Sequence, residues 1–155
     1  MNEKDIGILT ELQKDSSQSL KGISKKLGIP MSTVHERIRK LEQDGTILNY
    51  TAIIDGEKVG RPTTAFVLLE LYTTIPFDQK IVHPKTTAAE VAKLPGVQEV
   101  HVITGDKDLL VKVKGASIRE IGDLVLDKLI RIRGVKRTLT VEVLATAKES
   151  GEINL

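Results

Sequence analysis

The segment "LKGISKKLGIPMSTVHERIRKLEQDG", residues 20–45, predicts two helices separated by a tight turn. Ser19 precedes the first helix, where a serine hydroxyl can cap it. Gly28 ends that helix at a position where a positive φ is often required. Pro30 suits the first turn of the second helix, and Gly45 is a natural end. The apolar positions of the first helix recur at the spacing of one helix face: Leu20, Ile23 and Leu27.

The second helix has an apolar side and a polar, basic side. At about 100° per residue, Val34, Ile38 and Leu41 share one side. From residue 21 to residue 40 there are six bases against one acid, a local net charge of +5. A charge run alone is usually a solvated face, but together with the short turn it indicates a nucleic-acid site. The bases are Lys21, Lys25, Lys26, Arg37, Arg39 and Lys40.

Two helices in this arrangement are typical of a helix-turn-helix, whose second helix enters the major groove of double-stranded DNA. Ser32 and Thr33 lie near its start, where they can contact base edges or phosphates. Glu36 can accept from cytosine or reject other bases, and Arg39 can bind guanine. We expect phosphate or flanking contacts from Lys21, Lys25, Arg37 and Lys40. The alternative is a helical pair that only packs or dimerises.

The chain around this segment predicts two domains. Apolar residues recur at helical spacing over residues 3–14, which adds a preceding helix. Residues 46–55 are rich in β-formers, so we expect a strand that makes the helix-turn-helix winged or leads into a hinge. The predicted organisation is a DNA-binding domain (1–50), a strand or hinge linker (51–62) and a second domain (63–155).

The second domain alternates strand and helix patterns in the order βαββαβ, an α+β, ferredoxin-like arrangement. Capping boxes begin its two helices at Thr87 and at Ser117. We expect these helices to end at Leu94 and Gly134. The region 74–86 has no regular pattern. Strands are predicted over 63–73, 97–104, 109–114 and 135–145.

An apolar sheet face predicts a partner. We expect the two helices to cover one face of the sheet, and Leu110 and Leu144 to contribute to an apolar second face. Exposed apolar faces usually mark interfaces, and a reader of two DNA half-sites is commonly a dimer. A homodimer is therefore expected. The residues predicted to fill the helix-covered face are Leu109, Val111, Val113, Leu139, Val141 and Val143.

These motifs resemble the Lrp/AsnC family of transcription regulators. The likeness lies in "KDIGILTELQKDSSQSLKGISKKLGIPMSTVHERIRKLEQDGTI" (4–47), "VQEVHVITGDKDLLVKVKG" (97–115) and "IRGVKRTLTVEV" (132–143). The resemblance implies a helix-turn-helix followed by an effector domain. It also implies dimers, often assembled into octamers, that bind free amino acids at contacts between dimers.

The resemblance places an effector loop at residues 104–108. Gly105 would let backbone amides approach a ligand carboxylate. Asp106 or Asp108 could hold an α-ammonium group. Hydroxyls could come from Thr138 and Thr140. The chain departs from the family pattern at Pro30, where many members have Ser, at Lys107, where many have an aromatic residue, and in the longer region 74–86.

Other interpretations of the loop and of the chain stay open. A metal site would use His101 with Asp106 and Asp108, and perhaps His83, but the histidines lack tight ligand spacing. A plain hairpin turn needs no ligand. No nucleotide-binding or hydrolase motif supports an enzyme, and a DNA-binding architectural dimer without an effector is the alternative regulator.

Composition sets the remaining expectations. The chain of 155 residues has no Cys, which excludes disulfides, thiolate metal sites and a cysteine nucleophile. It has no apolar segment of membrane-spanning length and no signal segment. We therefore expect a cytoplasmic, nucleoid-associated protein with no metal, no membrane partner and no cofactor other than an effector amino acid.

Overall fold

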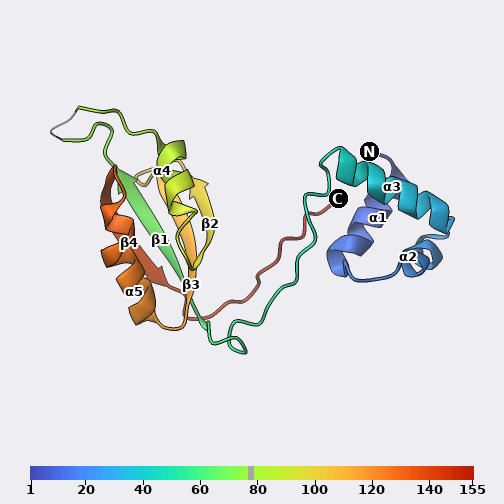
Figure 1. The fold of residues 1–155 in the computed structure, drawn as a ribbon. Coiled ribbons are helices and arrows are strands. Elements are labelled where there is room, and N and C mark those ends of the chain that lie inside the picture. The colour runs from blue at the N-terminus through green and yellow to red at the C-terminus, as the bar shows by residue number, and fades with distance from the viewer. Residues whose placement is uncertain (77–78) are drawn as a thin grey trace. The chain divides into compact units, whose positions relative to one another are not determined.

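The computed structural model describes residues 1–76 and 79–155, and the chain divides into two compact units (Figure 1). The first unit comprises residues 1–53 and 148–155, and the second comprises residues 54–147. The last eight residues, expected in the second domain, thus pack on the first. The side-chain amide of Gln13 holds them there, because it donates to the carbonyl of Ile153 (3.1 Å) and accepts from its N–H (2.7 Å).

The first unit contains three helices: α1 (Glu3–Lys14), α2 (Leu20–Leu27) and α3 (Met31–Gln43). The predicted signals at the ends of α2 are confirmed. The Ser19 hydroxyl accepts from the N–H of Gly22 (3.1 Å), and Gly28 has φ 65°. Pro30 precedes α3 without a side-chain cap, so the departure from serine leaves this helix start uncapped.

The helices enclose a small aliphatic core. Ile8, Ile23, Val34 and Ile38 are buried at its centre, one or more from each helix. Gly7 lies where α1 meets α2, and a Cβ there would be 3.1 Å from Leu27 Cδ2. The apolar spacing of the sequence therefore fixes which face of α3 turns inward and which face meets solvent.

The strand expected over residues 46–55 is wrong. Residues 44–62, all of them described, contain no strand. Leu48 and Ile53 are 89% and 93% exposed, so their side chains are largely open to solvent. A strand needs a hydrogen-bonded neighbour, and no segment of the first unit supplies one. The first unit therefore lacks the predicted wing strand.

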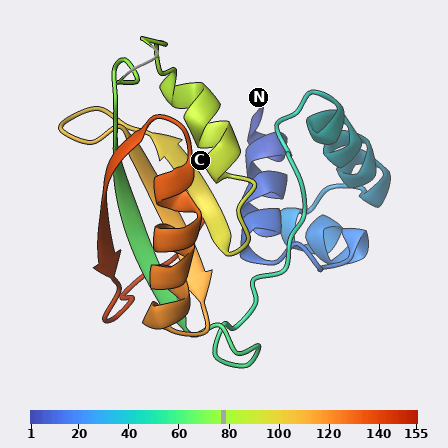
Figure 2. The same ribbon diagram turned by 60° about the vertical axis from the view of Figure 1, so that its left-hand side comes forward.

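The second unit confirms the βαββαβ order and the α+β class. Its four strands are β1 (Thr63–Leu71), β2 (Val97–Val102), β3 (Leu109–Gly115) and β4 (Val135–Glu142). They form an antiparallel sheet in the order β2-β3-β1-β4. The helices α4 (Pro84–Val91) and α5 (Ile118–Asp127) lie over the same face of it (Figure 2), and a 3₁₀ turn, η1 (Leu129–Arg131), follows α5.

The core lies between the sheet and the helices. Alternate residues of β1 and β3 are buried there, including Val67, Leu69, Leu109 and Val111. The prediction that Leu139, Val141 and Val143 fill this helix-covered face is wrong. Leu139 and Val141 pair opposite Leu68 and Phe66 on the other face and are 52% and 46% exposed, and Val143 follows the end of β4. We call this uncovered surface the open sheet face: Phe66, Leu68, Leu110, Leu139 and Val141.

The ends of both helices differ from the sequence prediction, and α4 ends at Val91 rather than at Leu94. Helix α4 begins at Pro84 rather than Thr87, because a proline suits the first turn and Thr87 is buried inside the helix. Ser117 caps α5 as expected, accepting from the N–H of Glu120 (3.2 Å), but α5 ends at Asp127 and η1 extends towards Gly134. Of the region 74–86, residues 77 and 78 lie outside the described residues.

Candidate DNA-binding surface and effector loop

The predicted DNA-reading residues lie together on the solvent side of α2 and α3. Val34, Ile38 and Leu41 are buried, so the opposite face of α3 is presented outwards. Thr33 of that face is half-buried. The other residues of the face are exposed: Ser32, Glu36, Arg39 and Lys40. Lys21 and Lys25 of α2 are exposed as well. Hydroxyls at the start of α3 and cations on both helices match a base-reading helix flanked by phosphate contacts.

Arg37 has a second role that the sequence did not reveal. Its Nη1 lies 3.5 Å from Oδ1 of Asp5, a carboxylate that is nearly buried at the start of α1. That oxygen has no hydrogen-bond partner among the described residues. The guanidinium therefore compensates a buried charge and holds α3 against α1, in addition to any contact with DNA.

Lys26, from the same basic run, is also committed to α1. Its Nζ donates to Oε2 of Glu11 at 2.6 Å, and Lys14 donates to Oε1 at 3.0 Å. The hydrogen bond from Lys26, followed by that from Lys14, holds the pKa of Glu11 below its usual value. Part of the positive run thus orients α2 on α1.

His35 was not among the predicted DNA contacts, yet it is exposed on the outer face of α3. It lies three residues after Ser32 and four before Arg39, so helical spacing places all three on one side. That spacing was the signal that could have identified it. Met31, at the first position of α3, is 54% exposed beside them.

The loop between β2 and β3 is a tight, exposed turn. Gly105 has φ 124°, a left-handed conformation that favours glycine. The N–H of Ile103 donates to the carbonyl of Asp108 (2.9 Å) and closes the turn. The Asp106 side chain is 91% exposed and pairs with Lys107 at 3.1 Å, and this hydrogen bond lowers the pKa of Asp106. Gly105 and Asp106 are therefore accessible to a ligand.

Asp108 is instead bound to the sheet. Its Oδ2 accepts from the N–H of Leu71 (2.7 Å), and its own N–H donates to the carbonyl of Leu69 (2.9 Å). The pairing of β1 with β4 shifts register between Glu70 and Leu71, so a carboxylate takes an N–H at the end of the ladder. Asp108 anchors the loop to β1.

Lys107 links the loop to a charged cluster. Its Nζ lies 4.0 Å from Oε2 of Glu70, whose other oxygen accepts from Lys136, and the hydrogen bond from Lys136 lowers the pKa of Glu70. The Lys107 side chain is only 20% exposed. Where the resemblance led us to expect an aromatic ring, this chain therefore has a half-buried ammonium group at the base of the loop.

The structure brings Thr138, but not Thr140, next to the anchor of the loop. Thr138 pairs opposite Leu69, the residue whose carbonyl binds Asp108, whereas Thr140 lies two positions further along β4. The side chains of the alternative metal site do not converge: His101 binds Glu99 (3.2 Å), and no group of three potential metal-binding side chains occurs within residues 1–76 and 79–155.

Comparison with known proteins agrees with a DNA-binding first unit and a ligand-binding second unit. Residues 64–153 match the Lrp/AsnC ligand binding domain, and residues 1–47 match the winged helix-turn-helix DNA-binding family. An HTH-type transcriptional regulator of Pyrococcus furiosus is 40% identical over 149 residues, covering 96% of each chain. The HTH-type transcriptional regulator FL11 of Pyrococcus horikoshii is 39% identical over 153 residues, which cover 99% of this chain and 95% of FL11.

A solved structure shares the fold. A transcriptional regulator from Neisseria meningitidis, crystallised in complex with L-Met, superposes with a TM-score of 0.89 at 24% identity, covering 99% of this chain and 96% of that one. None of the helices in the described parts of the present chain has the length and apolar character needed to cross a membrane.

Proposed function

This chain belongs to the Lrp/AsnC family of DNA-binding transcription regulators, and we propose that its assembly or its DNA binding responds to a free amino acid. The observation that carries the proposal is the exposed loop at Gly105 and Asp106. It combines the glycine backbone at Gly105, the accessible carboxylate of Asp106 and the ammonium group of Lys107. The L-Met bound to the Neisseria regulator of the same fold supports this class of ligand.

The chemistry of the loop suits both ends of an amino acid. Asp106 can bind the α-ammonium group by a charge-assisted hydrogen bond. Backbone N–H groups around Gly105 can receive the α-carboxylate, since no Cβ obstructs their approach. We assign the Thr138 hydroxyl a ligand contact near the anchored side of the loop, because Thr138 pairs opposite Leu69. In this assignment Asp108 is a positioning residue, and Thr140 contributes only if a ligand extends along β4.

DNA recognition in this proposal uses a homodimer. The open sheet face is apolar and uncovered in the single chain, which supports pairing of two copies there. Two copies would present two α3 helices to successive major grooves and give sequence-specific binding. An amino acid that binds the dimer and a higher assembly, such as an octamer, with unequal affinity would then shift the equilibrium between the two. We place this non-enzymatic complex in the cytoplasm, with the nucleoid.

One observation favours a second candidate, a DNA-binding architectural dimer with no effector. Both carboxylates of the loop already have partners, Asp108 at the N–H of Leu71 and Asp106 at Lys107. The turn is thus stable without a ligand. The two candidates share the DNA-binding unit and differ only in whether the loop binds anything.

Light scattering with each of the twenty amino acids separates these candidates. The wild type is compared with Asp106→Ala, which removes the accessible acid, and with Glu90→Ala, which removes an exposed acid of α4. A mass change with one or a few amino acids, abolished by Asp106→Ala and kept by Glu90→Ala, supports the effector. No mass change and no change in DNA affinity with any amino acid would leave the architectural dimer.

A further inference from the structure

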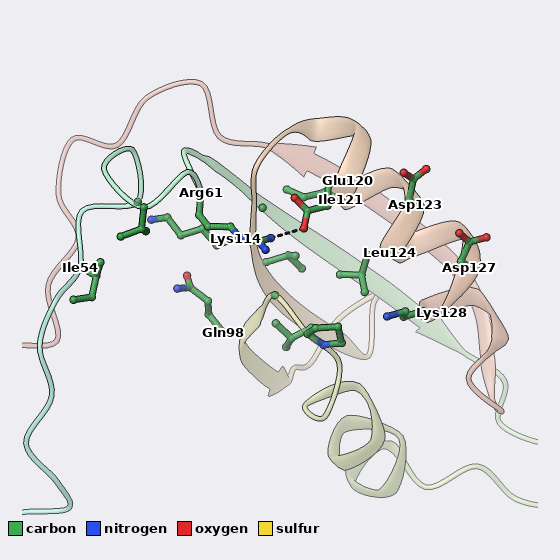
Figure 3. A pocket seen from close by; sticks show the side chains of 17 residues that line it. Ile54, Arg61, Gln98, Lys114, Glu120, Ile121, Asp123, Leu124, Asp127 and Lys128 are labelled. Carbon is green, nitrogen blue, oxygen red and sulfur yellow. Dashed lines mark hydrogen bonds and ion pairs between the residues drawn. The ribbon is translucent and has the colours of Figure 1, made fainter.

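A second hollow in the effector domain lies away from the loop. Its volume is about 530 Å³, and it is bounded by α5, the start of β2, the end of β3 and residues 54–61 (Figure 3). The Gly105 loop precedes β3, whereas this hollow is at Gly115, where β3 finishes. The two sites are therefore at opposite ends of one strand. The volume is in the range of pockets that hold small organic ligands, about 300–1,000 Å³.

The walls of this hollow are aliphatic. Ile121 and Leu124 of α5 project from one wall in Figure 3, and Ile54 lies across from them on the incoming segment. Ile54 and Val59 are 61% and 57% exposed, so the roof of the hollow has apolar side chains with little to cover them. None of the described lining residues is aromatic, so a planar base or ring has nothing to stack on. An aliphatic ligand body fits this lining best.

Two of the charged side chains at the rim are paired with each other. Arg61 pairs with Oε1 of Glu120, and Oε2 of Glu120 accepts from the N–H of Ala116 (2.7 Å). Asp123 and Asp127 point away from the hollow in Figure 3. The carboxylate of Glu120 is therefore not free to bind a ligand.

Lys114 and Lys128 line the hollow, and among the residues that the structure describes none pairs with either ammonium group. Of these two cations, Lys114 is the one that the neighbouring backbone confines. Its alkyl chain runs along Gly56, where a Cβ would lie 2.6 Å from Lys114 Cε. This contact directs an unpaired, half-buried cation to the rim of an aliphatic hollow.

We propose that this hollow binds an aliphatic carboxylate, with the hydrocarbon chain on Leu124 and the carboxylate on Lys114. The ligand would also contact Ile54 and Val59, in the segment that joins the first unit to β1. Binding would therefore order residues 54–61 and restrict the connection to the DNA-binding unit. This site is independent of the amino-acid loop and does not rest on it.

Isothermal titration of full-length protein with sodium octanoate tests the proposal. We expect saturable binding to the wild type, weakened about tenfold or more by Lys114→Met, which keeps the apolar stem and removes the charge. Lys85→Met, the same change on the exposed side of α4, should bind as the wild type does. Octylamine, with the same chain and the opposite charge, should bind at least tenfold more weakly than octanoate.

Two further measurements keep this site separate from the proposed effector. Leu124→Gln should weaken octanoate, whereas Asp106→Ala should leave it unchanged. Hydrogen exchange in residues 54–61 should slow when octanoate is present. Absence of octanoate binding, equal affinity for octylamine, or equal loss in Lys85→Met and Lys114→Met would overturn the site, while the amino-acid panel would still stand or fall by its own result.

Discussion

Replacing Asp108 by Ala should destabilise the effector domain, because its carboxylate is the partner of the N–H of Leu71. Leu71 is 8% exposed, and the N···Oδ2 distance is 2.7 Å. A hydrogen bond to a charged group contributes about 1.5–3 kcal/mol, and its loss leaves this N–H without a partner. We therefore expect the free energy of unfolding to fall by about 2 kcal/mol. Asp108→Asn keeps an acceptor oxygen and should cost about 1 kcal/mol or less.

Urea unfolding measures this difference. The chain has two tyrosines, so in a Tyr50→Phe background the fluorescence of Tyr72, the residue after β1, reports on the second unit alone. With a slope of about 2 kcal/mol per molar urea, the midpoint should fall by about 1 M in Asp108→Ala and by less than half of that in Asp108→Asn. Equal midpoints and slopes in Asp108→Ala and the parent would refute the anchoring role. If the role is confirmed, Asp106→Ala is the cleaner variant for testing the effector.

Three other outcomes are expected. Lys25→Ala should weaken binding to every duplex by a similar factor and reduce the slope of log affinity against log salt by about 1, measured by fluorescence anisotropy; an unchanged slope would remove Lys25 from the phosphate contacts. Because the pKa of Glu11 is lowered from 4.5, its ion pairs contribute fully to the stability of the first unit above pH 4.5. This contribution is lost as the pH falls through the lowered pKa, so the melting temperature of the first unit should fall there. In Lys26→Met the loss of stability with falling pH should be smaller. A pH profile identical to that of the wild type would contradict the ion pair. Gly122→Ala should stabilise α5 by about 0.5–1 kcal/mol, since nothing lies within 4 Å of the added Cβ, and a lower melting temperature would count against this.

The helix-turn-helix could be predicted from the sequence because its signals are local. Ser19 caps α2, Gly28 ends it, and the apolar spacing of α3 identifies the outward face that carries Ser32 and Arg39. Each of these signals acts within one or two helical turns of the chain. The same local logic would have found His35.

The errors arose where the outcome depends on distant segments. Residues 46–55 have β-forming side chains but no neighbouring strand, so propensity alone could not form one. In β4, apolar residues alternate regularly, yet alternation does not say which face the helices cover. Leu139 and Val141 therefore fell on the open sheet face. Thr87 resembled a cap, although Pro84 begins the helix.

The candidate sites show the same division. The Gly105 loop was identified by resemblance, but the anchoring of Asp108 depends on a register shift in a strand 37 residues earlier in the sequence. The hollow beside Lys114 combines residues 54–61, the start of β2 and helix α5, which no short motif connects. Such sites require the three-dimensional arrangement.

Selection of duplexes from a randomised DNA pool tests the central claim most directly. Wild-type protein should enrich a site with two related half-sites, and Arg39→Ala should lose the preference at one position of each half-site while it retains weak, salt-sensitive binding. Enrichment of no sequence by the wild type, or the same enriched sequence from Arg39→Ala and from variants of Ser32 and Glu36, would contradict base reading by α3.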